Sequence, residues 1–202
     1  MKKVLSFLNL DFQENQAVIA ASCFVSLAIN SYIGPMLCKT VITALPAQWL
    51  SFETVWCCLA SLALGVAWKG AFRKNAMKWF VAFAAAESLA GLSLGLWLAF
   101  AGWNVWVYAV FSLFYVSVVS FTIGKCIMAF KSKLWNEKSR EKFDNTDAIV
   151  RNVGLLLGGS AAMAFCPSLK TALVLFAVAC VVDDVGWITI YLKCRDRLEE
   201  GQ

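Results

Sequence analysis

Three carboxylates lie inside long apolar segments of this sequence: Glu87, Asp183 and Asp184. A charged side chain at the centre of a membrane-spanning helix costs on the order of 2.5 to 3.5 kcal/mol, so each acid needs a partner, a water-filled cavity or a proton. Two interpretations fit these residues. The acids either form a structural cluster of hydrogen bonds, or they support coupling by holding a proton or a cation that moves.

Polar side chains recur at helical spacing in two of the apolar segments. Ser22, Ser26 and Asn30 are four residues apart, as are Tyr108 and Ser112. Residues at this spacing share one face of a helix. Such a face either joins neighbouring helices through hydrogen bonds or lines a path for a solute. The candidates for a solute path are Asn30, Tyr32, Tyr108, Ser112 and Tyr115.

Other kinds of chemistry find little support in the residues. The chain has no His, its cysteines form no CxxC pair, and a nucleophile with an adjacent base is not recognisable. We therefore expect no enzyme activity, no metal and no cofactor. The net charge of +5 comes from basic residues that punctuate apolar runs, a pattern that does not favour nucleic-acid binding.

The composition places these residues in a membrane. Of the 202 residues, 60% are hydrophobic and only 15% are charged, whereas about a quarter of the residues in soluble domains are charged. Apolar stretches of roughly 17 to 26 residues are long enough to cross a bilayer as helices. No linker divides the chain, so residues 1–202 are predicted to form one all-α domain of six transmembrane helices. These helices are expected at about 17–38, 52–68, 76–101, 105–130, 148–165 and 169–192.

The basic residues give this arrangement a direction. Of the 18 Lys and Arg, only Lys39 and Lys170 fall in the loops on one side of the six segments. The excess of Lys and Arg marks the cytoplasmic side, so both termini are expected in the cytoplasm of a plasma or inner membrane. The cytoplasmic loop 131–147 is predicted to be amphipathic, and Asp144 with Asp147 resembles a cap that would start the fifth helix. Arg151 then falls in the first turn of that helix.

Two glycine patterns indicate close packing of helices. Gly91 with Gly95, and Gly154 with Gly158, have the GxxxG spacing that lets membrane helices approach each other. Packing within the bundle and a seam between two copies both use this spacing.

The loop after the second segment, residues 65–74, reads GVAWKGAFRK. It resembles the signature of the major facilitator superfamily, in which a Gly opens the stretch and a basic pair closes it. Gly65, Arg73 and Lys74 match this pattern, and Lys69 stands where the family has an acid. The resemblance implies a cytoplasmic gate at these four residues, and a path lined by the first and fourth helices.

Family members usually have two six-helix halves, and each half is built from inverted three-helix repeats. The chain is similar to the amino-terminal half, although no residue-level repeat is recognisable within it. The resemblance implies transport of a small solute by alternating access after pairing with a second copy or with another half-transporter chain. The alternative is a non-transporting membrane subunit that binds a small ligand or a partner membrane protein.

Overall fold

The computed structural model describes residues 16–67, 76–115 and 120–199. Within these ranges the chain contains α-helices and no strand, which confirms the predicted all-α class. The helices are α2 (Gln16–Ala44), α3 (Gln48–Ala67), α4 (Ala76–Phe100), α5 (Val105–Phe114), α6 (Ser120–Leu134), α7 (Glu137–Ala164) and α8 (Leu169–Glu199).

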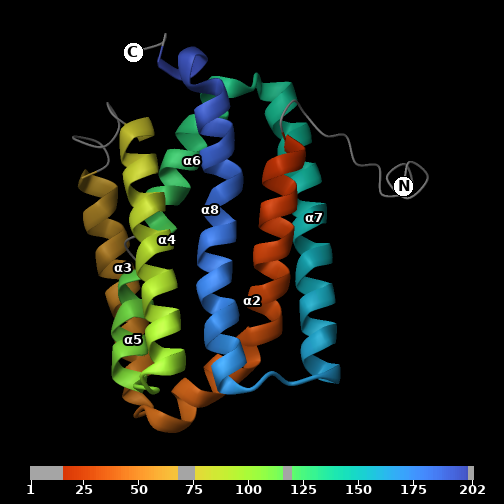
Figure 1. The fold of residues 1–202 in the computed structure, drawn as a ribbon. Coiled ribbons are helices and arrows are strands. Elements are labelled where there is room, and N and C mark those ends of the chain that lie inside the picture. The colour runs from red at the N-terminus through yellow and green to blue at the C-terminus, as the bar shows by residue number, and fades with distance from the viewer. Residues whose placement is uncertain (1–15, 68–75, 116–119, 200–202) are drawn as a thin grey trace.

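Most of the predicted segments correspond to one helix each, although their ends differ. α2 continues to Ala44 instead of ending near residue 38, and α8 continues to Glu199 instead of ending near residue 192. The range 105–130, predicted as one helix, is shared by α5 and α6. Short turns join α2 to α3, α4 to α5 and α7 to α8 at one end of the molecule (Figure 1).

The start of α7 corrects the sequence prediction. The side chain of Asn136 accepts a hydrogen bond from the Ser139 backbone N–H at 2.9 Å and caps a helix that begins at Glu137. Asp144 and Asp147 therefore lie inside α7 and do not cap it. Residues 131–147 are not a separate loop, because they form the end of α6, a short break and the first turns of α7. The buried ring of Phe143 packs 4.7 Å from the ring of Trp135 and favours this earlier start.

The helices run side by side along the height of the molecule (Figure 1). α8 packs against α4 on one side and α2 on the other, while α7 packs on the far side of α2. α6 packs against α4 and touches α8, α5 contacts α2, and α3 contacts α5 and α6. The helices α2, α8, α4 and the pass formed by α5 and α6 therefore close a ring, with α7 outside α2 and α3 outside α5 and α6.

This packing has an approximate internal symmetry if α5 and α6 are taken together as the fourth pass of the chain. Exchanging each pass with the one three places along the chain maps the contact of α2 with α8 onto that of α4 with α6, and the contact of α2 with α7 onto that of α3 with α5 and α6. The contacts of α4 with α8 and of α2 with α5 map onto themselves. The halves 16–100 and 105–199 are thus related in their packing.

Two apolar clusters fill the two ends of the bundle along the helix axes. One is rich in aromatic rings and includes Phe80, Phe130, Phe143 and Trp187. The other includes Ile33, Leu98 and Leu173, near the end that carries the short turns. Buried polar residues Ser26, Glu87 and Asp184 belong to neither cluster.

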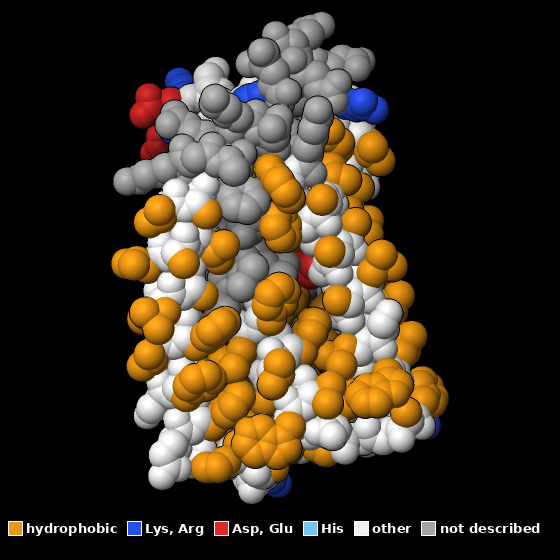
Figure 2. All heavy atoms as spheres, turned by 90° about the vertical axis from the view of Figure 1, so that its left-hand side faces the viewer, with side chains coloured by type: hydrophobic (Ala, Val, Ile, Leu, Met, Phe, Trp, Pro, Cys, Tyr) orange, Lys and Arg blue, Asp and Glu red, His pale blue; other side chains and the backbone are white. Residues whose placement is uncertain are grey.

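Three helical stretches among the described residues are long and apolar enough to cross a membrane: Gln16–Ala44, Trp79–Phe100 and Leu169–Lys193. Ser51–Ala67 and Val105–Phe114 are apolar but shorter. Figure 2 shows an outer face covered by hydrophobic side chains over most of its height. α7 is not among the three stretches, and its first turns are rich in charged residues.

Candidate functional site

Glycines bring the helices that carry the acids into close contact. Gly91 on α4 faces Cys180 on α8, and Gly95 faces Ala177 and the backbone carbonyl of Leu173. A Cβ atom at Gly95 would lie 2.8 Å from that carbonyl oxygen, closer than a real side chain tolerates. The contact between α4 and α8 therefore requires glycine at this position.

The second pair of glycines serves the contact between α7 and α2. Gly154 and Gly158 face the backbone carbonyls of Phe24 and Ala28 on α2. All four glycines that the sequence marked for packing thus lie at contacts between helices of the same chain.

Two of the predicted acids meet at the interface between α4 and α8. Asp184 is 2% exposed and accepts a hydrogen bond of 2.8 Å from the Ser88 hydroxyl. Glu87, the neighbour of Ser88 on α4, is 5% exposed and accepts a hydrogen bond from the Tyr115 hydroxyl. Among the described residues, the charges that act on Glu87 and Asp184 belong to other carboxylates. We call Glu87, Asp183 and Asp184 the carboxylate band.

Asp183, the third acid of the band, faces α2 and α7 and not α4. Asp183 lies within hydrogen-bonding reach of the Ser26 hydroxyl on α2, and Arg151 on α7 is the cation that acts on it. Adjacent residues of a helix point about 100° apart, which directs Asp183 and Asp184 to different sides of α8.

Arg151 lies near the middle of α7 and not in its first turn, because α7 begins at Glu137. Its Nε donates to Asp147 Oδ2 at 2.7 Å, and its Nη2 lies 3.7 Å from the Cys23 sulfur on α2. The second carboxylate oxygen of Asp147 is buried, with no hydrogen-bond partner in the described part of the chain. A charged network thus connects α7, α2 and α8 beside Asp183.

A cavity of about 230 Å³ lies next to Glu87. Its walls are Phe83, Phe111, Phe114, small residues of α4, and Tyr115. The cavity therefore combines an apolar wall with a carboxyl group that already has a hydrogen-bond donor.

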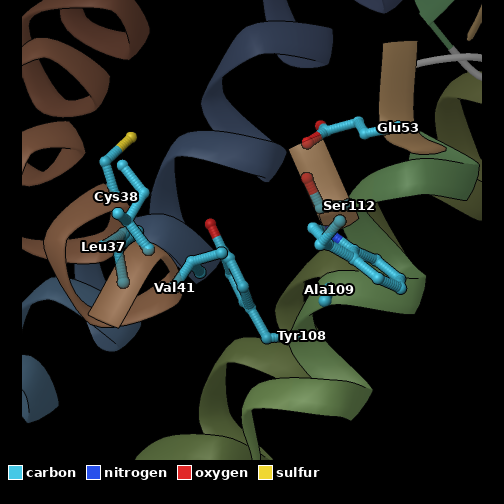
Figure 3. A pocket seen from close by; sticks show the side chains of 9 residues that line it. Leu37, Cys38, Val41, Glu53, Tyr108, Ala109 and Ser112 are labelled. Carbon is cyan, nitrogen blue, oxygen red and sulfur yellow. The ribbon is translucent and has the colours of Figure 1, made fainter. Parts of the chain in front are cut away.

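A second pocket, of about 160 Å³, lies between α2, α3 and α5 (Figure 3). Tyr108 directs its hydroxyl into this pocket, with Ser112 and Glu53 on one side and Cys38 on the other. We call it the α2–α3–α5 pocket. Sequence reasoning missed Glu53, whose signal is a single carboxylate in the second turn of an otherwise apolar helix.

The structure divides the five predicted path residues among four places. Tyr108 and Ser112 line the α2–α3–α5 pocket, and Tyr115 lines the cavity beside Glu87. Asn30 instead donates to the Ser26 hydroxyl oxygen at 3.3 Å, and Tyr32 lies along an open groove between α2 and α7.

The predicted gate falls mostly outside the described part of the chain. Gly65 lies in the last turn of α3, where an added Cβ atom would meet nothing within 4 Å. Lys69, Arg73 and Lys74 lie outside the described residues. In the ranges that are described, no cluster of three or more His, Cys, Asp or Glu could hold a metal ion.

No protein-family model, curated protein or solved structure matches this chain. The resemblance to the major facilitator superfamily therefore stays a prediction from residues 65–74 and the helix pattern. The fold and the site define a class at a coarser level: an all-helical protein with membrane-length apolar helices and carboxylates buried between them.

Proposed function

We propose that this chain is a half-size membrane transporter that moves a small solute by alternating access. It crosses the bilayer six times, keeps both termini in the cytoplasm, and works as a dimer or with a second half-transporter chain. The packing of the helices carries this proposal. Many transporters consist of inverted repeats, and here exchanging the first three passes with the last three reproduces the main contacts between helices.

The position of the carboxylate band supports a coupling role. In transporters built from repeats, substrate and coupling-ion sites lie near the middle of the bilayer at the interface between the repeats. Glu87 is on the third pass and Asp183 and Asp184 are on the sixth, and these corresponding passes of the two halves pack against each other. We therefore assign these acids to a proton or a cation that moves with the solute.

The resemblance adds a gate to this proposal. We assign the cytoplasmic gate to the signature region after the second pass. Its residues are Gly65, Arg73 and Lys74, which match the signature, and Lys69, which replaces the acid of the signature.

The alternative is a membrane subunit that binds a partner protein without transport. Large exposed apolar side chains on the outer helices α3 and α7 favour it, since Leu62 of α3 is 72% exposed and Met163 of α7 is 91% exposed. A partner membrane protein would cover these faces as well as lipid does.

Purified protein in liposomes that contain a pH-sensitive dye tests the transport proposal. A thermal-shift screen first selects solutes, because a ligand that binds only the folded state raises its stability. We expect a selected solute to enter the liposomes and to change the internal pH. Glu87→Gln and Asp183→Asn should still bind this solute but lose the pH change.

The control is Glu141→Gln, which alters an exposed residue of α7. Unchanged flux with an unchanged pH profile in the band variants would contradict coupling. Solutes that bind but never cross the bilayer, together with a chain that stays monomeric in detergent at high concentration, would favour the binding subunit.

A further inference from the structure

We infer that the α2–α3–α5 pocket binds a small organic cation, of the size of a short alkylammonium ion. This inference rests on the proposed function in one respect, namely that the bound cation is the transported solute. Its basis is the chemistry of the pocket walls, which combine one carboxylate, two aromatic rings and two hydroxyl groups in an otherwise apolar cavity.

The volume of the pocket limits the ligand. An apolar cavity of about 150 Å³ accommodates benzene, so a pocket of about 160 Å³ holds a ligand of similar size. Larger metabolites such as nucleotides do not fit. Hydrated inorganic ions would leave the apolar walls formed by Leu37, Val41 and Ala109 without a partner.

Glu53 is the reason why the proposed ligand is a cation. It is the only charged residue among the described side chains that line the pocket, and no hydrogen bond or ion pair among the described residues occupies its carboxylate. In Figure 3 this carboxylate and the Tyr108 hydroxyl lie on the same cavity. A cationic nitrogen between them gains a charge-assisted hydrogen bond, which is stronger than one between neutral groups.

The aromatic walls favour a cation further. The ring of Trp49 is held between Phe52 and Trp106, with centroid distances of 5.5 and 5.6 Å. Tyr108 packs against Trp103 at 5.4 Å and Phe176 at 5.9 Å. Rings fixed in this way are preorganised, and the faces of Trp and Tyr attract ammonium groups.

The cavity beside Glu87 is less suited to this ligand. The carboxyl group of Glu87 already accepts the Tyr115 hydroxyl and is almost fully buried, whereas Glu53 is half-buried and open to the pocket. The two acids therefore have separate tasks, with Glu53 recognising the ligand and the carboxylate band coupling its movement.

Cys38 provides the test, because it lines the pocket and is exposed. Purified protein is alkylated with N-ethylmaleimide in the presence of n-butylammonium, 1-butanol or butyrate, and the modified peptides are measured by mass spectrometry. Cys166, exposed in the turn between α7 and α8, is the control within the same molecule.

We expect n-butylammonium to slow the alkylation of Cys38 and to leave that of Cys166 unchanged. The neutral alcohol should need a concentration about tenfold higher, and butyrate should give no protection. Glu53→Gln should abolish the advantage of the cation over the alcohol, and Glu141→Gln should keep it.

Equal protection by the alcohol and the cation would overturn the inference, as would protection by butyrate. If Glu53→Gln does not fold, the comparison of the three ligands on the unsubstituted protein still tests whether the pocket prefers a cation. Protection of Cys38 without flux of n-butylammonium into liposomes would uphold the binding site and contradict transport. Transport of another solute without any protection by the cation would contradict the inference alone.

Discussion

The Ser88 hydroxyl is the only donor within the described residues that joins α4 to the Asp184 carboxylate. Asp184 is 2% exposed, so water does not replace this donor. A buried carboxyl group without a hydrogen-bond donor destabilises the folded state, because water solvates the same group in the unfolded chain. Ser88 therefore has a larger effect on stability than an ordinary serine on a membrane helix.

We predict that Ser88→Ala lowers the free energy of unfolding by about 1 to 3 kcal/mol. Ser93→Ala is the matched control, because Ser93 lies on the same helix and is exposed, and it should change stability by less than about 0.5 kcal/mol. Unfolding in mixed detergent and SDS, followed by circular dichroism, measures both. Equal losses for the two variants would contradict a role for the bond to Asp184.

The sequence identifies some of these residues and misses others for a physical reason. Glu87, Asp183 and Asp184 stand out because a charge in an apolar run is costly wherever its partner lies. Glu53 and Asp147 do not stand out, because they lie near the ends of apolar runs, where charges are common. The significance of Glu53 depends on Tyr108, which another helix places beside the same pocket. Asp147 instead pairs with Arg151 four residues along α7, and this pair lies inside a helix only because α7 begins at Glu137.

At the scale of the helix, glycine contacts decide which pairs of helices approach closely. The pair α4 and α8 is in contact at Gly91 and Gly95, where a side chain would collide with Cys180 and with the Leu173 carbonyl. Close contact of this kind provides the van der Waals attraction that replaces the hydrophobic effect within lipid.

We expect Gly95→Ala to destabilise the protein by about 1 to 3 kcal/mol, because the new methyl group must displace the backbone of α8. Gly124→Ala is the control, since a Cβ atom at Gly124 on α6 meets nothing within 4 Å. Alanine has the higher helix propensity, so this control should be neutral or more stable by about 0.4 to 1 kcal/mol. Thermal unfolding of the two purified variants gives the comparison, and a neutral Gly95→Ala would refute the close contact.

The helices themselves are predictable from the apolar pattern, but some of their ends are not. The sequence predicts a cap at Asp144, whereas the structure places the cap of α7 at Asn136, eight residues earlier. The earlier start is supported by contacts with other parts of the chain, since Lys131 pairs with Asp144 at 2.7 Å and lies 4.5 Å from the centre of the Phe143 ring.

At the scale of the whole molecule, charge is unequally divided between the two ends of the bundle along the helix axes. The end that holds the start of α7 and the end of α8 carries Lys133, Lys138 and Arg195, whereas the end with the short turns carries Lys39 and Lys170. The symmetric packing of the helices was not predictable, because it follows from helix contacts and leaves no recognisable residue-level repeat in the chain.

We predict that the turn between α7 and α8 faces the outside of the cell. A membrane-impermeant maleimide added to intact cells should modify Cys166, which is exposed in this turn. In a Glu141→Cys variant, the new thiol at the opposite end should react only after the membrane is permeabilised. The reverse pattern would contradict the proposed direction of the chain, and equal labelling before permeabilisation would contradict a membrane between the two ends.

The two adjacent acids on α8 have a mechanical consequence. Asp184 is anchored to α4 through Ser88, and Asp183 lies against α2 and the Arg151 network, so one stiff rod is gripped on both flanks. Because the two carboxylates lie on adjacent residues of one helix, any change in the orientation of α8 that alters the contact of one acid with its neighbouring helix also alters that of the other.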